Sequence, residues 1–415
     1  MSVAPHIAEY MASSSFIRKM FEEGIQMKAQ FGADNVYDFS LGNPDLEPPA
    51  RIKTMLAQAA AETRRGMHSY MPNAGYPFAR AAMAEKVSAE QGVNVEASSI
   101  VMGVGAAGAM NSVLKALLSP GDEVLVPAPF FPEYTHYCRN HGGSLRPVKS
   151  MEDFSLDHRA IADALGKNTA AVIICSPNNP TGRVYSEQDI AELGAILEAH
   201  GKSTGRFPLL IADEPYREII YDNRRVAPVF PVYSHSVIVS SFAKNLGLPG
   251  ERIGYTAVNP AHPSCTELID AIIFCTRILG YVNAPATFQR IVAECWKEPV
   301  DYGSYARRRD ALTAILDKAG ITYADPGGAF YLFCKVPQQG DTSPRGDTSP
   351  RGDTSPLDSA AGDDKAFCAH LKRFRILAVP GTGFGAPGWF RLAYCTAEST
   401  IANARDSFIQ ASREW

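Results

Sequence analysis

Several motifs that could bind or activate a small molecule each follow a short apolar run. Residues 103–108 (GVGAAG) follow the run 99–102 and precede a helical pattern. Backbone amides at the start of a helix, together with the helix dipole, suit an anion such as a phosphate. The dinucleotide-binding form of this motif needs an acidic residue at the end of the next strand. That strand ends instead in Pro127-Ala128-Pro129, so we interpret the motif as a phosphate site.

Polar side chains follow other apolar runs in the same way. Those that could do chemistry are Asn179, Asp213, Tyr216 and Lys244. A lone lysine after a strand is usually a solvated chain end, but this one lies between two serines and Arg252. Ligands of open α/β sheets bind beyond the carboxyl ends of the strands. We therefore expect these side chains to share one site with the phosphate motif.

The elements that must position these residues alternate between strands and helices. Strands are indicated at 99–102, 123–126, 170–175, 209–212 and 237–240, and helices at 107–118 and 187–200. Unbroken aliphatic runs indicate strands that are buried on both faces, and their alternation with helices indicates a parallel sheet. We therefore predict an α/β fold with a large, doubly wound, mostly parallel sheet domain.

The flanks of the chain predict a second, smaller α+β domain built from both ends. Its helices are expected at 13–31, within 270–318, at 363–374 and at 398–412, and its strands at 329–336 and 390–394. The predicted division is 1–45 for the N-terminal part of the small domain, 46–290 for the large domain and 291–415 for the C-terminal part. The repeat GDTSPR at 340–356 interrupts the last part. Since it lacks apolar residues, we interpret it as a solvated loop.

Composition excludes several other classes of protein. The 415 residues carry a net charge of -4, which argues against a nucleic-acid partner. No apolar run approaches the roughly 20 residues of a membrane span, and the N-terminus lacks an apolar signal core, so no membrane association is expected. The eight cysteines show no C-x-x-C spacing, and no metal site is indicated. We expect buried thiols in a cytoplasmic protein.

The motifs together resemble one family over nearly the whole chain. Residues 38–45, 176–182, 240–252 and 390–394 are similar to the class I/II aminotransferases of the aspartate aminotransferase superfamily, which are pyridoxal-phosphate enzymes of fold type I. The repeat at 340–356 is not part of the family pattern. The resemblance implies ping-pong exchange of an amino group between an amino acid and a 2-oxo acid. It also implies pyridoxal 5'-phosphate as cofactor and a homodimer with composite active sites.

The resemblance assigns a role to each residue around the cofactor ring. Lys244 would bind the cofactor aldehyde as a Schiff base and later move the substrate proton. Asp213 would pair with the protonated pyridine nitrogen and keep the ring an electron sink. Asn179 and Tyr216 would bind the phenolic oxygen, and Phe131 would stack on the ring. Catalysis is thereby assigned to Lys244, Asp213 and Tyr216.

The phosphate and the substrate would be held by other residues of the family pattern. The expected phosphate ligands are Gly105, Ala106, Ala107, Ser241 and Arg252, with Tyr70 reaching the phosphate of the other subunit. Arg391 would grip the substrate α-carboxylate through a planar, bidentate fork, helped by the Gly42 backbone and by Asn179. The alternative for Arg391 is a surface cation on an edge strand.

The sequence leaves alternatives for the activity and the substrate. A carbon–sulfur β-lyase would use the same site, whereas a catalytically silent ligand sensor would usually carry an added DNA-binding module. About 40 residues precede Gly42, and they are not rich in basic side chains. The family position for a side-chain-binding arginine falls on Ile278, one residue from Arg277. Because one residue turns a helical side chain by about 100°, the sequence does not indicate a preference for aspartate.

Overall fold

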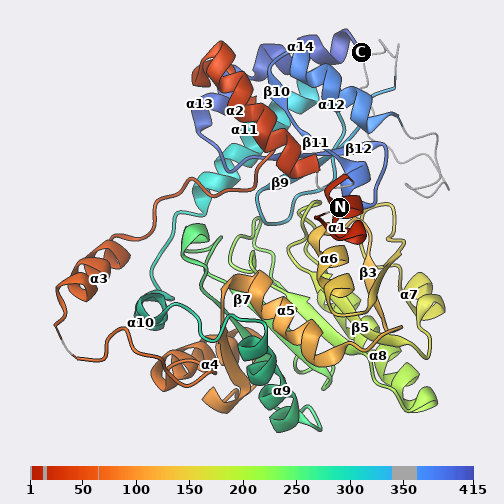
Figure 1. Cartoon of the computed structure of the whole chain (residues 1–415). Helices are drawn as coiled ribbons and strands as arrows, with labels where there is room; N and C mark the ends of the chain where they lie inside the picture. Colours follow the sequence, from red (N-terminus) through yellow and green to blue (C-terminus); the bar gives the residue numbers. More distant parts are fainter. Residues whose placement is uncertain (1, 13–15, 64, 339–361) are drawn as a thin grey trace. The chain divides into compact units, whose positions relative to one another are not determined.

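The computed structural model describes residues 2–12, 16–63, 65–338 and 362–415 (Figure 1). The chain divides into two compact units. The larger unit comprises Pro44–Tyr302 and Gly327–Ala329, and the smaller comprises Met1–Asn43, Gly303–Pro326 and Phe330–Trp415. Residues 291–302, which we had expected in the smaller domain, cluster with the larger unit. The repeat at 340–356 lies outside the described residues.

The larger unit is built on one large sheet. In the part of the chain that the structure describes, this sheet has seven strands in the order β2-β8-β7-β6-β5-β3-β4. The strands are β2 (Ile100–Gly103), β3 (Glu123–Pro127), β4 (Ser144–Val148), β5 (Thr169–Cys175), β6 (Leu209–Asp213), β7 (Ser236–Ser241) and β8 (Gly254–Val258). Neighbours from β7 to β4 pair in parallel, whereas β8 is antiparallel to both β2 and β7. The predicted α/β fold with a mostly parallel sheet is confirmed, with β8 as the exception.

Helices cover both faces of this sheet (Figure 1). They are α4 (Pro77–Gln91), α5 (Gly105–Leu117), α6 (Glu133–Asn140), α7 (His158–Ala164), α8 (Glu187–Thr204), α9 (Cys265–Ile278) and α10 (Ala286–Cys295). The helix α3 (Ala50–Ala61) packs against α10, and short 3-10 turns lie at Ala97–Ser99 and Pro249–Glu251. Alternate strand residues enter opposite cores. Leu210 belongs to a core that includes residues of α4, α8 and α10, and Ile211 belongs to a second core that includes residues of α5, α6 and α9. The sheet is therefore doubly wound, because helices pack on both of its faces.

The smaller unit combines short strands with helices from both chain ends. Its strands are β1 (Tyr37–Asp38), β9 (Tyr331–Lys335), β10 (Ile376–Leu377), β11 (Val379–Pro380) and β12 (Trp389–Ala393). Its helices are α1 (Pro5–Ala12), α2 (Phe16–Phe31), α11 (Gly303–Ala319), α12 (Asp364–Arg373), α13 (Glu398–Asn403) and α14 (Arg405–Arg413), with 3-10 turns at Ala33–Asn35 and Gly381–Phe384. β1 pairs in parallel with β10, and β12 lies between β11 and β9 in an antiparallel sheet. The helix expected at 398–412 is divided at Ala404.

Candidate functional site

The site residues predicted in the larger unit lie at one edge of its sheet. β2 ends at Gly103, β5 at Cys175, β6 at Asp213 and β7 at Ser241, and these strands run in the same direction. β8 runs in the opposite direction, so it begins at this edge, at Gly254. The carboxyl edge of such a sheet is where open α/β folds bind their ligands. Because β8 is antiparallel, the residues directly before it, such as Arg252, lie at the same edge.

The start of α5 forms a cradle for an anion. Gly105 opens this helix with a φ of +66°, and a Cβ there would lie 2.9 Å from Arg252 Nη2. A Cβ at Gly254 would lie 2.8 Å from the Gly105 carbonyl carbon, so the two backbones approach closely. Gly254 also pairs with Ser241 across β7 and β8. The structure therefore brings Arg252 and Ser241 to the positive end of a helix, which suits a phosphate.

The first turn of α5 continues the cradle through Ala106 and Ala107, which are partly buried. The Arg252 guanidinium donates a hydrogen bond from Nη1 to the Pro249 carbonyl at 3.0 Å, and Arg252 itself adopts a φ of +51°. The 3-10 turn at Pro249–Glu251 thus fixes the arginine before β8 begins. A guanidinium held at a helix N-terminus adds a full positive charge to the helix dipole.

Asp213 carries a buried carboxylate at the centre of this edge. Its Oδ2 accepts a hydrogen bond from the Tyr134 hydroxyl at 2.5 Å. Its Oδ1 is buried and has no hydrogen-bond partner among the described residues. Burial raises the pKa of Asp213 to about 6, although the hydrogen bond from Tyr134 acts in the opposite direction. A buried carboxylate oxygen without a partner is costly, so this geometry suits a cationic N–H donor supplied by a ligand.

Tyr134 is a site residue that our reading of the sequence missed. It lies on α6, close behind Phe131, and the two rings meet edge to face with centroids 5.5 Å apart. Burial raises the pKa of the Tyr134 hydroxyl well above its ordinary value, and the charges of Asp213, Cys175 and Tyr216 raise it further. The hydroxyl therefore stays protonated and donates to Asp213. The sequence signal that could have indicated Tyr134 is the group of aromatic residues after β3, which also contains Phe130 and Phe131.

Asn179 and Tyr216 are both buried in loops at the same edge. Asn178 stabilises the loop of Asn179, because its Oδ1 accepts hydrogen bonds from the Thr181 amide at 3.2 Å and hydroxyl at 2.9 Å. The Tyr216 carbonyl accepts from the Ile219 amide at 2.8 Å, which closes the turn after β6. Both side chains are thus positioned by tight backbone turns directly after a strand.

Lys244 follows β7 in a closed loop. The Phe242 amide donates to the Ile253 carbonyl at 3.1 Å, and the Leu248 amide donates to the Phe242 carbonyl at 3.2 Å. Lys244 is partly buried between these two backbone contacts. The structure therefore places the lysine on a short loop at the carboxyl edge, and this loop follows β7, the neighbour of the strand that ends at Asp213.

The smaller unit carries a buried arginine. Arg391 lies on β12, the central strand of its sheet, and is 2% exposed, so it is not a surface cation on an edge strand. Its Nη2 donates to the Ser40 carbonyl at 2.7 Å, and its guanidinium lies 4.6 Å from the Tyr331 ring centroid and 4.9 Å from that of Phe384. A Cβ on Gly42 would clash with Tyr331 Oη. Gly42 and Arg391 are thus both held against Tyr331, which the sequence had not indicated.

Two predicted residues stand apart from these groups. Tyr70 is 90% exposed, and so the larger unit covers little of its side chain. Arg277 is exposed near the end of α9, and its neighbour Ile278 is 51% exposed. In addition, none of the helices in the described part of the chain combines the length and the apolar character that crossing a membrane requires.

A mostly parallel sheet with an anion cradle, a buried carboxylate and a lysine at its carboxyl edge is typical of α/β enzymes that bind a ligand at that edge. The family model for aminotransferase class I and II matches residues 34–408. The chain belongs to this family and is an aminotransferase.

Relatives and solved structures agree with this assignment. The chain is 30% identical over 377 residues to an aspartate/prephenate aminotransferase of Thermus thermophilus, covering 88% of each chain. It is 27% identical over 416 residues to an aspartate aminotransferase of Geobacillus stearothermophilus, covering 97% of each. A crystal structure of an aminotransferase from Eubacterium rectale matches with a TM-score of 0.90 and 35% identity, over 100% of this chain and 99% of that one. The relatives are named as transaminases, and none of these names indicates a lyase.

Proposed function

We propose that this aminotransferase binds pyridoxal 5'-phosphate at the carboxyl edge of its large sheet. The observation that carries the proposal is the buried Asp213 Oδ1, which has no hydrogen-bond partner among the described residues. A protonated pyridine nitrogen would donate to this oxygen and neutralise the carboxylate. Because an unpaired buried charge is strongly destabilising, such a pair would stabilise both the ring and its site.

The other groups at this edge fit the rest of the cofactor. The phosphate would be held by the amides of Gly105, Ala106 and Ala107, the Ser241 hydroxyl and the Arg252 guanidinium. Phe131 would stack on the ring, and Tyr134 supports it by the edge-to-face contact described above. Asn179 and Tyr216, both buried in loops at the same edge of the sheet, would bind the phenolic oxygen. Each chemical feature of the cofactor thus has a residue type that suits it.

The residues of the chain then perform distinct tasks in the exchange of the amino group. When bound, the cofactor supplies an electron sink for the bond that breaks at the substrate α carbon. Lys244 Nζ, in its neutral form, would take the proton from that carbon and return it to the cofactor. Arg391, desolvated between Tyr331 and Phe384, would bind the α-carboxylate of the amino acid and later that of the oxo acid. Both half-reactions use the same residues, as a ping-pong exchange requires.

The proposed assembly is a homodimer with composite sites. Among the exposed large side chains of the larger unit are Tyr70 at 90%, Phe274 at 60% and Ile278 at 51%. A second copy of the chain would cover such groups, and Tyr70 would then be able to reach the phosphate of its partner. We also propose a cytoplasmic location. All eight cysteines lie in the described part of the chain and are free thiols, as is usual in a reducing compartment.

Borohydride reduction of the loaded enzyme tests the cofactor site. The cofactor should become attached covalently to Lys244, and peptide mass spectrometry identifies the labelled residue. Lys244→Ala should fold, retain less cofactor and show no transamination. Attachment to a different lysine would contradict the proposed site.

A second experiment identifies the substrate. Aspartate and an apolar amino acid are added separately to the loaded enzyme, and the conversion of the cofactor absorbance is followed. Several relatives are named for aspartate, whereas the position expected to bind the substrate side chain carries Ile278 in this chain. Conversion by aspartate alone would assign that specificity, and release of pyruvate and ammonia from a cysteine conjugate would instead indicate a lyase.

A further inference from the structure

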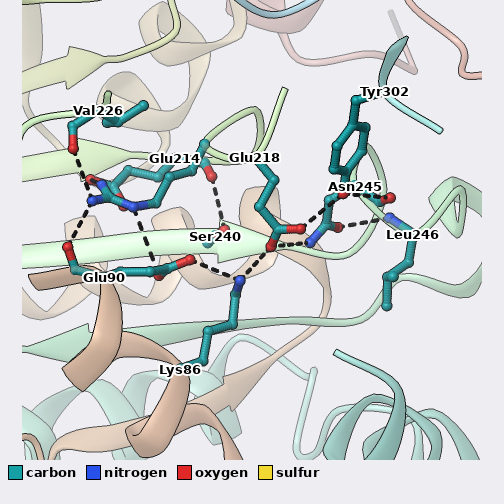
Figure 2. A network of polar contacts seen from close by, with 10 residues as sticks. Lys86, Glu90, Glu214, Glu218, Val226, Ser240, Asn245, Leu246 and Tyr302 are labelled. Carbon is teal, nitrogen blue, oxygen red and sulfur yellow. Dashed lines mark hydrogen bonds and ion pairs between the residues drawn. The ribbon is translucent and has the colours of Figure 1, made fainter. Parts of the chain in front are cut away.

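A buried polar network joins the loops that follow β6 and β7, as Figure 2 shows. Lys86 on α4 lies at its centre with a side chain that is 6% exposed. Its Nζ lies 2.8 Å from Glu90 Oε1 and also contacts Glu218 Oε1. Glu218 lies in the loop after β6, which begins directly after Asp213 and also carries Tyr216. The network therefore ties a helix of the large unit to a loop of the proposed site.

The Glu218 carboxylate contacts the residue that directly follows Lys244. Its Oε1 accepts a hydrogen bond from Asn245 Nδ2 at 2.9 Å, and its Oε2 accepts one from the Tyr302 hydroxyl at 2.8 Å. The same hydroxyl lies 3.1 Å from the Asn245 carbonyl oxygen. Asn245 Oδ1 in turn accepts from the Leu246 amide at 2.9 Å. Side chain and backbone of Asn245 are thus both fixed.

A second arm of the network contacts the residue after Asp213. Glu214 Oε1 lies 2.9 Å from Arg217 Nη1, and Arg217 Nη2 donates to the carbonyls of Glu90 at 2.9 Å and Val226 at 3.1 Å. The Ser240 hydroxyl donates to the Glu214 carbonyl at 3.0 Å, which links the ends of β6 and β7 (Figure 2). The network therefore holds the immediate neighbours of Asp213 and Lys244.

The charges of the network indicate a role other than stability. Three acidic side chains, those of Glu90, Glu214 and Glu218, face two cations, Lys86 and Arg217. Buried ion pairs rarely stabilise a fold more than apolar residues of the same volume would. Burial opposes ionisation of Glu218, but Lys86 and the hydrogen bonds from Asn245 and Tyr302 lower its pKa overall, so it remains a carboxylate. A fixed charge at this place can orient its hydrogen-bond donors.

We propose that Glu218, held by Lys86 and Tyr302, is a positioning residue that directs Lys244 through Asn245. The proposal rests on the role proposed above for Lys244. Glu218 does not need to touch the substrate or the cofactor, because it acts on the backbone that carries the lysine. Its loss should therefore change the reactivity of the Lys244 amine and the turnover number, while substrate binding changes little.

A charge exchange between the two side chains tests this coupling. Asn245→Asp places a second carboxylate against Glu218 Oε1, where the amide now donates at 2.9 Å. It should lower kcat about tenfold, roughly the rate equivalent of one hydrogen bond to a charged group. KM for the amino acid should stay within about twofold. Adding Glu218→Gln to this variant restores a donor and an acceptor in exchanged positions, and kcat should return to within about threefold of wild type.

A second readout does not depend on turnover. In the full-length, cofactor-free protein, acetylation by acetic anhydride is quantified at Lys244 by peptide mass spectrometry, with the exposed Lys335 as internal reference. Asn245→Asp should change the relative rate at Lys244 at least about threefold, and the double variant should restore it. Asp122→Asn is the matched control. Asp122 is a buried carboxylate that pairs with Arg206 at 2.7 Å and precedes β3, at the opposite edge of the sheet. It should leave both readouts unchanged.

The outcomes separate the two proposals. If Asn245→Asp lowers thermal stability but leaves kcat and Lys244 acetylation within about twofold of wild type, the network is structural only and the positioning role is wrong. Failure of the double variant to recover either readout, despite normal folding, also overturns the coupling between Glu218 and Asn245. If borohydride attaches the cofactor of the wild-type enzyme to another lysine, the proposed function fails first, and that result is independent of these variants.

Discussion

Replacing Asp213 by asparagine should stabilise the cofactor-free enzyme at neutral pH, even though it removes the proposed partner of the cofactor ring. Burial raises the pKa of this carboxyl from its ordinary 3.8 to about 6. A shift of one pKa unit corresponds to about 1.4 kcal/mol. For this shift of about two units, ionisation of the buried carboxyl lowers the free energy of unfolding by about 3 kcal/mol. Asparagine carries no such charge and can still accept the hydrogen bond from Tyr134.

The sign follows from the direction of the shift. Since the folded-state pKa is raised, the contribution of Asp213 to stability is fully present below about pH 4 and is lost as the pH rises through about 6. The difference in unfolding free energy between Asp213→Asn and wild type should therefore grow by up to about 3 kcal/mol from pH 4 to pH 7 and then level off. Urea unfolding of both cofactor-free proteins across this range, followed by tryptophan fluorescence, measures the difference.

Asp153→Asn provides a control with the opposite sign. Burial acts to raise the pKa of Asp153, but hydrogen bonds from Ser155 and the charge of Arg183 lower it overall. This variant should lose stability relative to wild type as the pH rises. Adding pyridoxal phosphate should make wild type more stable than Asp213→Asn, because the loaded wild type then gains an ion pair. If the difference in unfolding free energy between Asp213→Asn and wild type does not change between pH 4 and pH 8, the argument that the carboxylate is desolvated is refuted.

Three further predictions concern single contacts of the site. Tyr134→Phe removes the donor to Asp213 Oδ2, so the pKa of Asp213 should rise further and the pH-dependent loss of stability should move to higher pH in the same unfolding assay. Arg391→Ala should raise KM for both the amino acid and the oxo acid about thirtyfold or more, since both present a carboxylate, while cofactor binding measured by absorbance stays unchanged. Gly105→Ala places a Cβ 2.9 Å from Arg252 Nη2 at a φ of +66°, so equilibrium dialysis should show weaker retention of pyridoxal phosphate and of inorganic phosphate.

The sheet was predictable where a strand is buried on both faces. β5 reads Thr-Ala-Ala-Val-Ile-Ile-Cys and every residue in it is buried, so its apolar run was sufficient. β4 reads Ser-Leu-Arg-Pro-Val at the edge of the sheet and is largely exposed, so it lacks that signal. β8 is apolar, but its direction depends on the strands it pairs with rather than on its own residues. Local sequence therefore indicated β2, β3, β5, β6 and β7, but it missed the exposed edge strand β4 and also β8, although β8 is buried throughout.

The site was predictable where a functional residue directly follows a strand. Asp213 and Lys244 could be found because the carboxyl edge of a sheet collects such residues. Tyr134 is separated from Asp213 by 79 positions, and Lys86 is separated from Glu218 by 132. Contacts of this kind depend on the packing of α4 and α6 against the sheet. No pattern within one segment of the sequence indicates them.

The pairing of β1 with β10 has a consequence for how the chain is made. Tyr37 pairs with Ile376, so the N-terminal strand leaves the ribosome long before its partner exists. At about 5–20 residues per second, the interval is on the order of tens of seconds. During that time the larger unit, whose strands all lie between residues 100 and 258, can be completed. The N-terminal segment, in contrast, must wait with its apolar residues uncovered, and Val36 and Phe39 become buried after the last part of the chain arrives. Burial of the segment around β1 therefore depends on residues that are among the last to be synthesised.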